Sequence, residues 1–176
     1  MEEINDLMGI ISHLCKCEVK FIIAGGVAVV LQGVERLTMD VDLALQMNKK
    51  NIGKFLQAMI DLHMVPRVPV SGDILLSSEK INLMIEQKGA IVFTFIDPRM
   101  PLKQVDVFLT PNLSYDSLDG FTESVKIGGK KIKILSKQKL IELKLQVDPM
   151  RDKDLQDIKN LQVLINEETK EKNKKR

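Results

Sequence analysis

Three aspartates in two separate strand-like stretches carry the clearest chemical signal of this chain. Asp40 and Asp42 lie in residues 36–45, where apolar and polar residues alternate, and Asp106 lies between two valines in residues 104–109. Residues two apart on a strand point to the same face, about 6.5–7 Å apart, and a neighbouring strand lies about 4.8 Å away. Three carboxylates so placed can hold two divalent ions about 3.5–4 Å apart. Oxygen ligands select Mg²⁺ or Mn²⁺ rather than zinc.

The alternative interpretation is that each aspartate is an ordinary solvated residue or a cap at the end of a strand. Against it, desolvated like charges repel one another and need cations or protons to offset them. Asp106 is the most informative of the three, because valines flank it and Phe108 and Leu109 follow it. The spacing alone leaves both interpretations open.

A second signal is the pair Gly25-Gly26, which directly follows the apolar run 19–24. Glycines without Cβ atoms let backbone N–H groups approach a ligand, and a helix start after them favours anionic oxygens such as those of a triphosphate. A tight turn explains the dipeptide equally well. The chain contains neither a G-x-x-x-x-G-K-[ST] loop nor a G-x-G-x-x-G fingerprint. Gly128-Gly129, between two short strand-like runs, predicts a hairpin turn.

Apolar periodicity predicts the elements that position these residues. The predicted helices are residues 3–16, 27–32, 48–63 with Asn48 as cap, 77–88, 136–147 and 153–165. The predicted strands are residues 19–24, 36–45, 90–96, 104–109, 123–127 and 130–134. Helices and strands are interleaved and the last third is helical, which indicates an α+β or α/β chain.

The formal net charge of +2 is concentrated at the C-terminal end, because residues 166–176 hold five basic and three acidic side chains. The rest is close to neutral, so a polyanion would need a local basic patch. One candidate patch is formed by seven lysines against the single acid Glu142: residues 126, 130, 131, 133, 137, 139 and 144. A solvated hairpin and helix face is the alternative interpretation. Residues 166–176 contain no apolar residue and are predicted to be disordered.

Cys15 and Cys17, with His13, lie in one helical segment and give little indication of a metal site. Residues two apart on a helix point to different faces, and a zinc site needs a second group of ligands from elsewhere. We therefore predict ordinary packing and surface thiols, and assign no role to His63. No apolar run is long enough to span a membrane, and the acidic start of the chain is unlike a signal peptide. These features predict a cytoplasmic protein without a membrane partner.

Taken together, these motifs resemble the nucleotidyltransferase superfamily with the polymerase-β-like core, and more narrowly the small bacterial group related to abortive-infection type IV toxins. The matching segments are residues 24–28, 32–33, 36–43 and 105–107, followed by a lysine and a D-x-x-D motif in residues 135–145 and 151–158. The resemblance implies an α+β fold with a mixed sheet and a helical C-terminal part. Residues 1–134 would form the core, 135–165 the helical part and 166–176 the tail. Where relatives often have a lysine two residues before the third aspartate, this chain has Gln104 beside Lys103.

The resemblance also implies an activity, which is transfer of a nucleoside monophosphate from an NTP to an acceptor with release of pyrophosphate. Asp40, Asp42 and Asp106 would hold Mg²⁺ or Mn²⁺, with Asp106 the base for the acceptor hydroxyl. The implied nucleotide-binding residues are Gly25 and Gly26 for the β- and γ-phosphates, Arg36, Thr38, Lys144, Asp154 and Asp157. Arg36 could instead pair with Asp40, and a salt bridge to Arg151 is the alternative for the last two aspartates.

The acceptor and the partners are left open. The toxin resemblance implies RNA as a possible acceptor, contacted by the lysines of residues 126–144, and an antitoxin protein as a possible partner. One alternative is a catalytically inactive module with the same fold that binds a nucleotide or a partner protein. Another is an antibiotic nucleotidyltransferase built on the same core.

Overall fold

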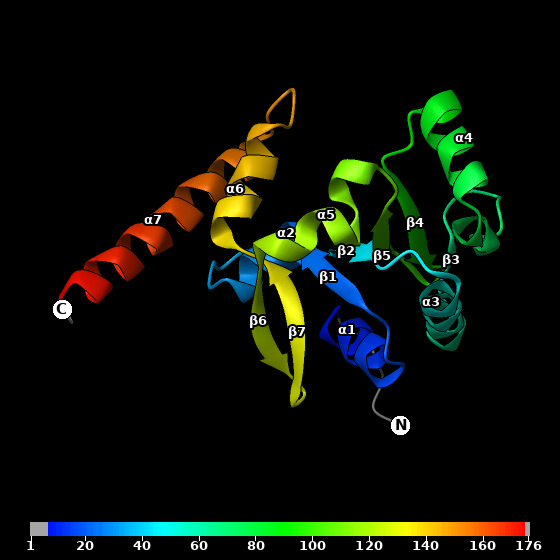
Figure 1. Ribbon diagram of the computed structural model, residues 1–176, viewed down its shortest axis with the longest axis horizontal. Helices are drawn as coiled ribbons and strands as arrows, with labels where there is room; N and C mark the ends of the chain where they lie inside the picture. The colour runs from blue at the N-terminus through cyan, green and yellow to red at the C-terminus, as the bar shows by residue number, and fades with distance from the viewer. Residues whose placement is uncertain (1–6, 175–176) are drawn as a thin grey trace.

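The computed structural model describes residues 7–174 (Figure 1). Its helices are α1 (Leu7–Lys16), α2 (Gly25–Leu31), α3 (Lys49–Asp61), α4 (Ser78–Lys88), α5 (Tyr115–Leu118), α6 (Lys137–Leu145) and α7 (Asp152–Lys174). Its strands are β1 (Phe21–Ala24), β2 (Asp40–Leu45), β3 (Val65–Pro66), β4 (Val92–Asp97), β5 (Met100–Phe108), β6 (Thr122–Ile127) and β7 (Lys130–Leu135). Three short 3₁₀ turns are η1 (Gly72–Leu76), η2 (Pro111–Leu113) and η3 (Asp119–Phe121).

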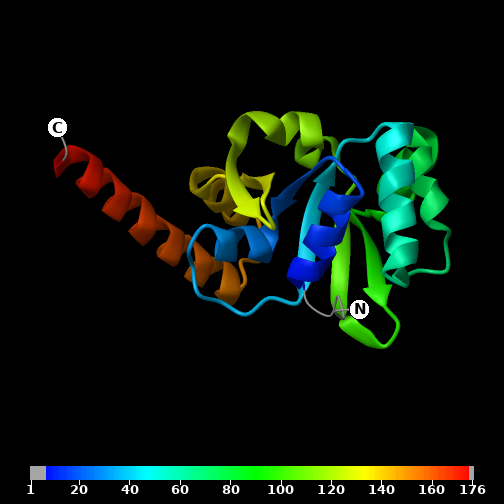
Figure 2. The ribbon, with the colours of Figure 1, turned by 90° about the horizontal axis from the view of Figure 1, so that it is seen from below.

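The strands form one mixed sheet in the order β3-β4-β5-β2-β1-β7-β6. β2 pairs with β5, and β1 with β7, in parallel, and the other neighbours are antiparallel. All four residues of β1 are buried, as expected of a central strand covered on both faces. Figures 1 and 2 show α1 and α3 beside each other against the strands, away from α6 and α7. The predicted α+β fold with a mixed sheet and a helical C-terminal part is confirmed.

Local chemistry sets the bounds of most elements where the sequence predicts them. Asn48 caps α3 by accepting a hydrogen bond from the Asn51 backbone N–H, and Ser77 caps α4 in the same way through Lys80. Gly128 and Gly129 have φ of +55° and +79° and form the predicted turn between β6 and β7. No helix among residues 7–174 combines the length and the apolar character needed to cross a membrane. Residues 3–6 of the first predicted helix lie outside the described part of the chain.

Two strand predictions need correction. β2 begins at Asp40 rather than at residue 36, because Arg36 and Thr38 turn their side chains to Asp157 and Asp40 and the preceding segment joins no ladder. β5 begins at Met100 instead of residue 104, because it forms a hairpin with β4 through the Asp97–Met100 pair.

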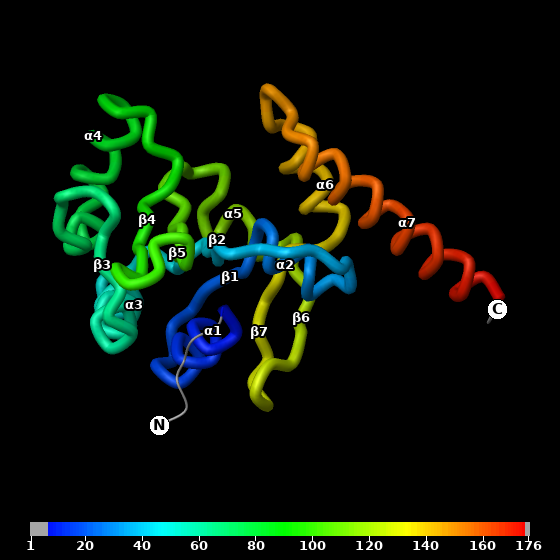
Figure 3. Tube along the Cα trace, turned by 180° about the vertical axis from the view of Figure 1, so that it is seen from behind, coloured from blue at the N-terminus to red at the C-terminus, as the bar shows by residue number. Residues whose placement is uncertain are grey.

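The C-terminal end also differs from its prediction of disorder over residues 166–176. Helix α7 continues to Lys174 and projects from the body of the protein (Figure 3), while residues 175–176 lie outside the described chain. Lys137 of α6 forms an ion pair with Glu168 at 2.8 Å. Side-chain hydrogen bonds four residues apart support the polar part of the helix, such as Gln162 to Asn166. A polar segment can therefore stay helical without an apolar face.

Candidate active site

Parallel pairing of β2 and β5 brings the three aspartates of the sequence prediction together. Asp42 lies directly opposite Asp106, and Asp40 lies opposite Gln104. Residues opposite each other on neighbouring strands share a face of the sheet, and so do residues two apart. The three carboxylates therefore gather on one face, where all three line the same cavity.

The diglycine packs directly against these acids. β1 pairs with β2 so that Ala24 lies opposite Asp42, and the chain turns into α2 at Gly25 with φ of +55°. A Cβ atom at Gly25 would lie 1.8 Å from Asp42 Oδ2, and one at Gly26 would lie 2.5 Å from Thr38 Oγ1. The Gly26 backbone N–H donates a hydrogen bond to Asp42. Both glycines are therefore required by close approach to the acidic site.

Crowding and burial shift the protonation of two of the aspartates. Burial first, and then the neighbouring charges of Asp40 and Asp106, raise the pKa of Asp42 to about 7, against the opposing effects of Lys144 and the Gly26 N–H. Burial also raises the pKa of Asp106, against the hydrogen bond from Thr94 and in the same direction as the Asp40 charge. Such repulsion among oxygen donors is what a bound Mg²⁺ or Mn²⁺ would relieve, so the residues present fit a divalent cation.

Two residues that the sequence analysis missed support this cluster. Thr94 of β4 lies opposite Asp106 and donates a hydrogen bond from Oγ1 to Asp106 Oδ1 at 2.5 Å. Arg67, just after β3, donates from its guanidinium to Gln104 Oε1 at 3.0 Å and from its backbone N–H to the Thr94 carbonyl. The alternation of residues 93–95, with a threonine between two phenylalanines, was a signal for Thr94, whereas nothing local pointed to Arg67.

Arg67 also accounts for the departure at Gln104. Lys103 is buried and lies next to Gln104 in β5. Since side chains alternate along a strand, Lys103 points to the opposite face of the sheet from Gln104 and Asp106. Gln104 lies on the face of the acids and binds Arg67. The positive charge near the third aspartate therefore comes from Arg67, in the segment after β3, and not from a lysine two residues before that aspartate.

The D-x-x-D motif forms a buried charge network with the cations proposed to bind phosphate. Lys144 Nζ lies 2.8 Å from both Asp154 Oδ1 and Asp157 Oδ2. Arg36 donates to Asp157 Oδ2 at 2.6 Å, and Arg151 donates to Asp154 Oδ2 at 2.6 Å. Arg36 thus pairs with Asp157 and not with Asp40. The alternative Arg151 salt bridge is present for Asp154, so these residues join α6, α7 and the segment before β2.

The network predicts a loss of stability when its central cation is removed. Lys144→Met would leave the buried carboxylates of Asp154 and Asp157 with only Arg151 and Arg36 as partners. We expect the free energy of unfolding to fall by about 3 kcal/mol, the lower end for breaking a buried ion pair. Urea denaturation measures this, with exposed Lys153→Met as the matched control. A stability loss below that of the control would contradict a structural role for Lys144.

A cavity of about 690 Å³ adjoins the acids. The three aspartates line it together with Gly25 and Gly26, and its apolar lining residues include Ile91, Phe108, Leu113 and Leu143. Among the residues that the structure describes, Thr110 Oγ1 is the buried side-chain atom without a hydrogen-bond partner, and Thr110 lines this cavity. Volumes of this size suit small-molecule ligands and cofactors.

The lysine-rich stretch 126–144 is largely neutralised within the described structure. Four of its seven lysines pair with acids: Lys133 with Asp119, Lys137 with Glu168 and Glu123, Lys139 with Glu142, and Lys144 with Asp154 and Asp157. Lys130 and Lys131 lie at the start of β7, which runs parallel to β1, so they lie at the opposite end of the sheet from Gly25. The stretch therefore forms no continuous basic surface beside the acids.

Comparison with known proteins identifies the fold. No family model matches the sequence, and no curated protein matches it either. The lincosamide antibiotic adenylyltransferase LnuA, in its lincomycin-bound crystal structure, matches with a TM-score of 0.59 and 17% identity, over 90% of this chain and 95% of its own. The solution structure of the antibiotic-resistance factor ANT(2'')-Ia matches with a TM-score of 0.53 and 14% identity, over 89% and 88% of the two chains.

A third match is an antigenic nucleotidyltransferase-like protein from Paracoccidioides brasiliensis, with a TM-score of 0.51 and 17% identity, over 88% of this chain and 72% of its own. The first structure is thus described as an antibiotic adenylyltransferase, the second as an antibiotic-resistance factor and the third as a nucleotidyltransferase-like protein. The chain therefore has a nucleotidyltransferase fold. The narrower resemblance to abortive-infection toxins stays a prediction from the sequence.

Proposed function

We propose that this protein is a metal-dependent nucleotidyltransferase, which moves a nucleoside monophosphate from an NTP to a hydroxyl group of a small acceptor. The single observation that carries the proposal is the register that sets Asp42 opposite Asp106, with Gly25 packed on the Asp42 carboxylate. A binding module without turnover would have little use for three crowded carboxylates whose mutual repulsion opposes folding. The fold shared with nucleotidyltransferases agrees with this activity.

In this proposal each residue of the cluster has a defined task. Asp40, Asp42 and Asp106 would hold Mg²⁺ or Mn²⁺, which when bound would neutralise charge on the phosphates. Thr38 holds Asp40 by a hydrogen bond of 2.7 Å, and Thr94 holds Asp106. These two hydroxyls fix the carboxylates before the substrate arrives, which lowers the cost of organising the site.

The reaction itself is a displacement at the α-phosphorus of the NTP. The acceptor oxygen forms the new bond to phosphorus, the bond to the pyrophosphate oxygen breaks, and pyrophosphate leaves. The proton of the acceptor hydroxyl passes to Asp106, whose raised pKa suits a general base better than an ordinary carboxylate. Gly25 and Gly26, without side chains, let the start of α2 pack against Asp42 and Thr38, and their backbone would bind the β- and γ-phosphates.

The cavity favours a small acceptor over RNA. Apolar residues, including Ile91, Phe108 and Leu113, form part of the cavity lining, and the unpartnered Thr110 hydroxyl can bind a polar group of the acceptor. The lysines expected to contact RNA are mostly paired with acids or lie at the far end of the sheet. Two structures with this fold belong to antibiotic-modifying or antibiotic-resistance proteins. We therefore place a hydroxyl-bearing antibiotic-like molecule ahead of RNA and of a toxin–antitoxin role.

The test is incubation of the protein with each α-labelled NTP and Mg²⁺, with a lincosamide, an aminoglycoside or total RNA as acceptor. We expect label on a small acceptor, and loss of at least about 10³-fold in rate for Asp106→Asn. Asp73→Asn, an exposed aspartate of η1, is the matched control and should retain full activity.

Other outcomes separate the alternatives. Label on RNA alone would support the toxin interpretation and overturn the small acceptor. NTP binding that depends on Mg²⁺, without transfer to any acceptor, would support the inactive module. Transfer that persists in Asp106→Asn would show that the proposed acidic site is wrong.

A further inference from the structure

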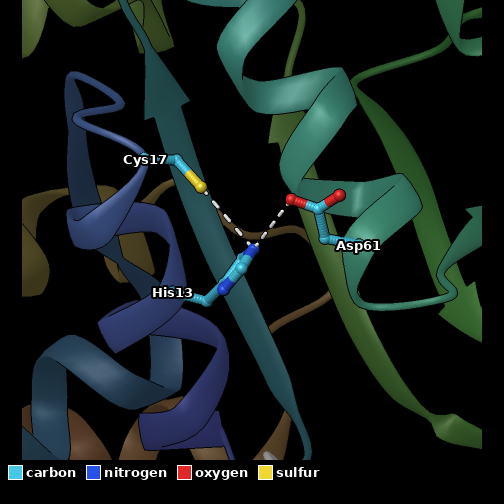
Figure 4. A group of neighbouring side chains, drawn as sticks. All are labelled: His13, Cys17 and Asp61. Atoms are coloured by element: carbon cyan, nitrogen blue, oxygen red, sulfur yellow. Dashed lines mark hydrogen bonds and ion pairs between the residues drawn. The ribbon is translucent and has the colours of Figure 1, made fainter.

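A second cluster of ligating side chains joins α1 to α3, apart from the acidic site. His13 lies in the last turn of α1, Cys17 follows that helix directly, and Asp61 is the last residue of α3. Figure 4 shows the three side chains turned toward one another. Their ligating atoms all lie within 4.8 Å of one another. The sequence around His13 and Cys17 offers no ligand from a distant segment, which argued against a metal site. In the structure, Asp61 supplies such a ligand.

Backbone geometry fixes the two segments that carry these residues. After α1, Glu18 adopts a φ of +55° and the Val19 N–H donates to the Leu14 carbonyl. After α3, His63 adopts the same φ and the Met64 N–H donates to the Met59 carbonyl. Both helices therefore end in a Schellman-type cap, which closes the last turn by backbone hydrogen bonds. The caps hold Cys17 and Asp61 in place without help from a ligand.

The two distances from His13 Nε2 to its neighbours match edges of a zinc coordination tetrahedron. His13 Nε2 lies 3.5 Å from Cys17 Sγ and 3.3 Å from Asp61 Oδ2. Bond lengths of about 2.0–2.1 Å to nitrogen and oxygen and about 2.3 Å to sulfur give tetrahedral edges of about 3.5 Å for N···S and about 3.3 Å for N···O. The imidazole is thus already at the spacing from the thiol and the carboxylate that such an ion requires, and all three ligating atoms lie within 4.8 Å of one another.

His13 Nε2 alone cannot make good hydrogen bonds to both of its neighbours. His13 Nε2 either carries a proton, which it can donate well to one neighbour, or a lone pair, which repels the Asp61 carboxylate. A carboxylate only accepts, so one ring nitrogen serves Cys17 or Asp61 but not both. A cation at the centre satisfies the nitrogen, the sulfur and the oxygen together.

Two surrounding features favour a cation at this place. The other carboxylate oxygen of Asp61, Oδ1, accepts a hydrogen bond from Gln57 Nε2 at 2.9 Å, which leaves Oδ2 facing His13. Outer-shell hydrogen bonds of this kind orient metal ligands. The C-terminal ends of α1 and α3 both lie at the cluster, and helix C-termini carry partial negative charge.

We propose that His13, Cys17 and Asp61 form a binding site for Zn²⁺ or a similar transition metal, with the fourth position open to solvent. A thiolate and an imidazole select zinc-like ions over Mg²⁺, so this site differs in metal preference from the aspartate cluster. It lies where the chain enters β1, whereas Gly25 lies where β1 ends. Its role is structural, because the ion would tie α1 to α3.

The test is titration of the full-length protein with Co²⁺, which reports sulfur ligation by a thiolate-to-metal charge-transfer absorption. We expect this band in the wild type and in Cys15→Ser, whose thiol lies two residues away outside the cluster. Cys17→Ser should lose the band. His13→Gln and Asp61→Asn should weaken Co²⁺ binding at least about tenfold, and Gln57→Leu by about tenfold. Circular dichroism confirms that each variant is folded.

A second readout separates this site from the aspartates. Zn²⁺ is expected to raise the Tm of Asp42→Asn, but not that of the double variant Asp42→Asn/Cys17→Ser, in which both sites are disabled. No charge-transfer band in the wild type, or a band that Cys17→Ser retains, would overturn the proposal. Loss of the band in Cys15→Ser would also overturn it, because the ligand would then be the wrong cysteine.

Discussion

Asp42→Asn is expected to reduce nucleotidyl transfer by at least about 10³-fold, because Asp42 lies at the centre of the acidic cluster, between Gly25 and Asp106. A loss of this size corresponds to about 4 kcal/mol of transition-state stabilisation, as expected when a ligand of a catalytic divalent ion is removed. The measurement is the rate of label transfer from the NTP at saturating Mg²⁺. Activity within tenfold of the wild type would contradict the assignment.

The same substitution should stabilise the metal-free fold, which separates a catalytic defect from misfolding. The pKa of Asp42 is about 7 in the fold, against its ordinary value of 3.8, so the folded state binds a proton more tightly than the unfolded state. In the wild type this contribution is fully present below about pH 4 and is lost as the pH rises to about 7. In the presence of EDTA, the free energy of unfolding of Asp42→Asn should exceed that of the wild type by about 2–4 kcal/mol at pH 8. At pH 4 the difference should be much smaller.

Gly25→Ala is the second substitution with a large expected effect. The new Cβ would lie 1.8 Å from Asp42 Oδ2, and the alanine would have to adopt a φ of +55°. The carboxylate or the start of α2 must therefore move, and the acidic cluster loses its arrangement. We expect loss of transfer by at least about 10²-fold, since misplacement by about 1 Å costs this much. Label transfer and Tm measure the two consequences.

Gly89→Ala provides the matched control for Gly25→Ala. Gly89 also has a positive φ, of +59°, at the C-cap of α4, but a Cβ there would meet nothing within 4 Å. It therefore adds only the strain of a left-handed alanine, about 1–2 kcal/mol. Equal losses of activity in the two variants would show that backbone strain, and not contact with Asp42, explains the effect.

The residues of the acidic cluster could be singled out from the sequence because their signals are local, although spacing alone left both a metal site and solvated aspartates open, and the family resemblance joined them into one site. Polar and apolar residues alternate along β2, and the valines on either side of Asp106 show the same two-residue alternation in β5. The diglycine comes immediately after β1 in the sequence. The hairpin at Gly128-Gly129 and the Asn48 cap were likewise predictable, since each depends on the chemistry of neighbouring residues.

Contacts between distant segments were beyond the same reasoning. Arg36 binds Asp157, which lies more than a hundred residues away in the sequence, and Arg67 binds Gln104 from the segment after the edge strand β3. The approach of Asp61 to His13 depends on how α3 packs against α1, which no local spacing encodes. The polar end of α7 was predicted to be disordered from composition, whereas the ion pair from Lys137 and contacts along the helix maintain it.

The parallel pairing of β2 with β5 has a consequence for how the protein is made. Residues 46–99 separate the two strands, and a parallel pair needs such a long crossover before it can form. Closing this loop is entropically unfavourable and slows folding relative to hairpins such as β6–β7. The proposed acidic site should therefore assemble late, after the ribosome has released β5, because a shorter nascent chain would contain Asp40 and Asp42 but not Asp106.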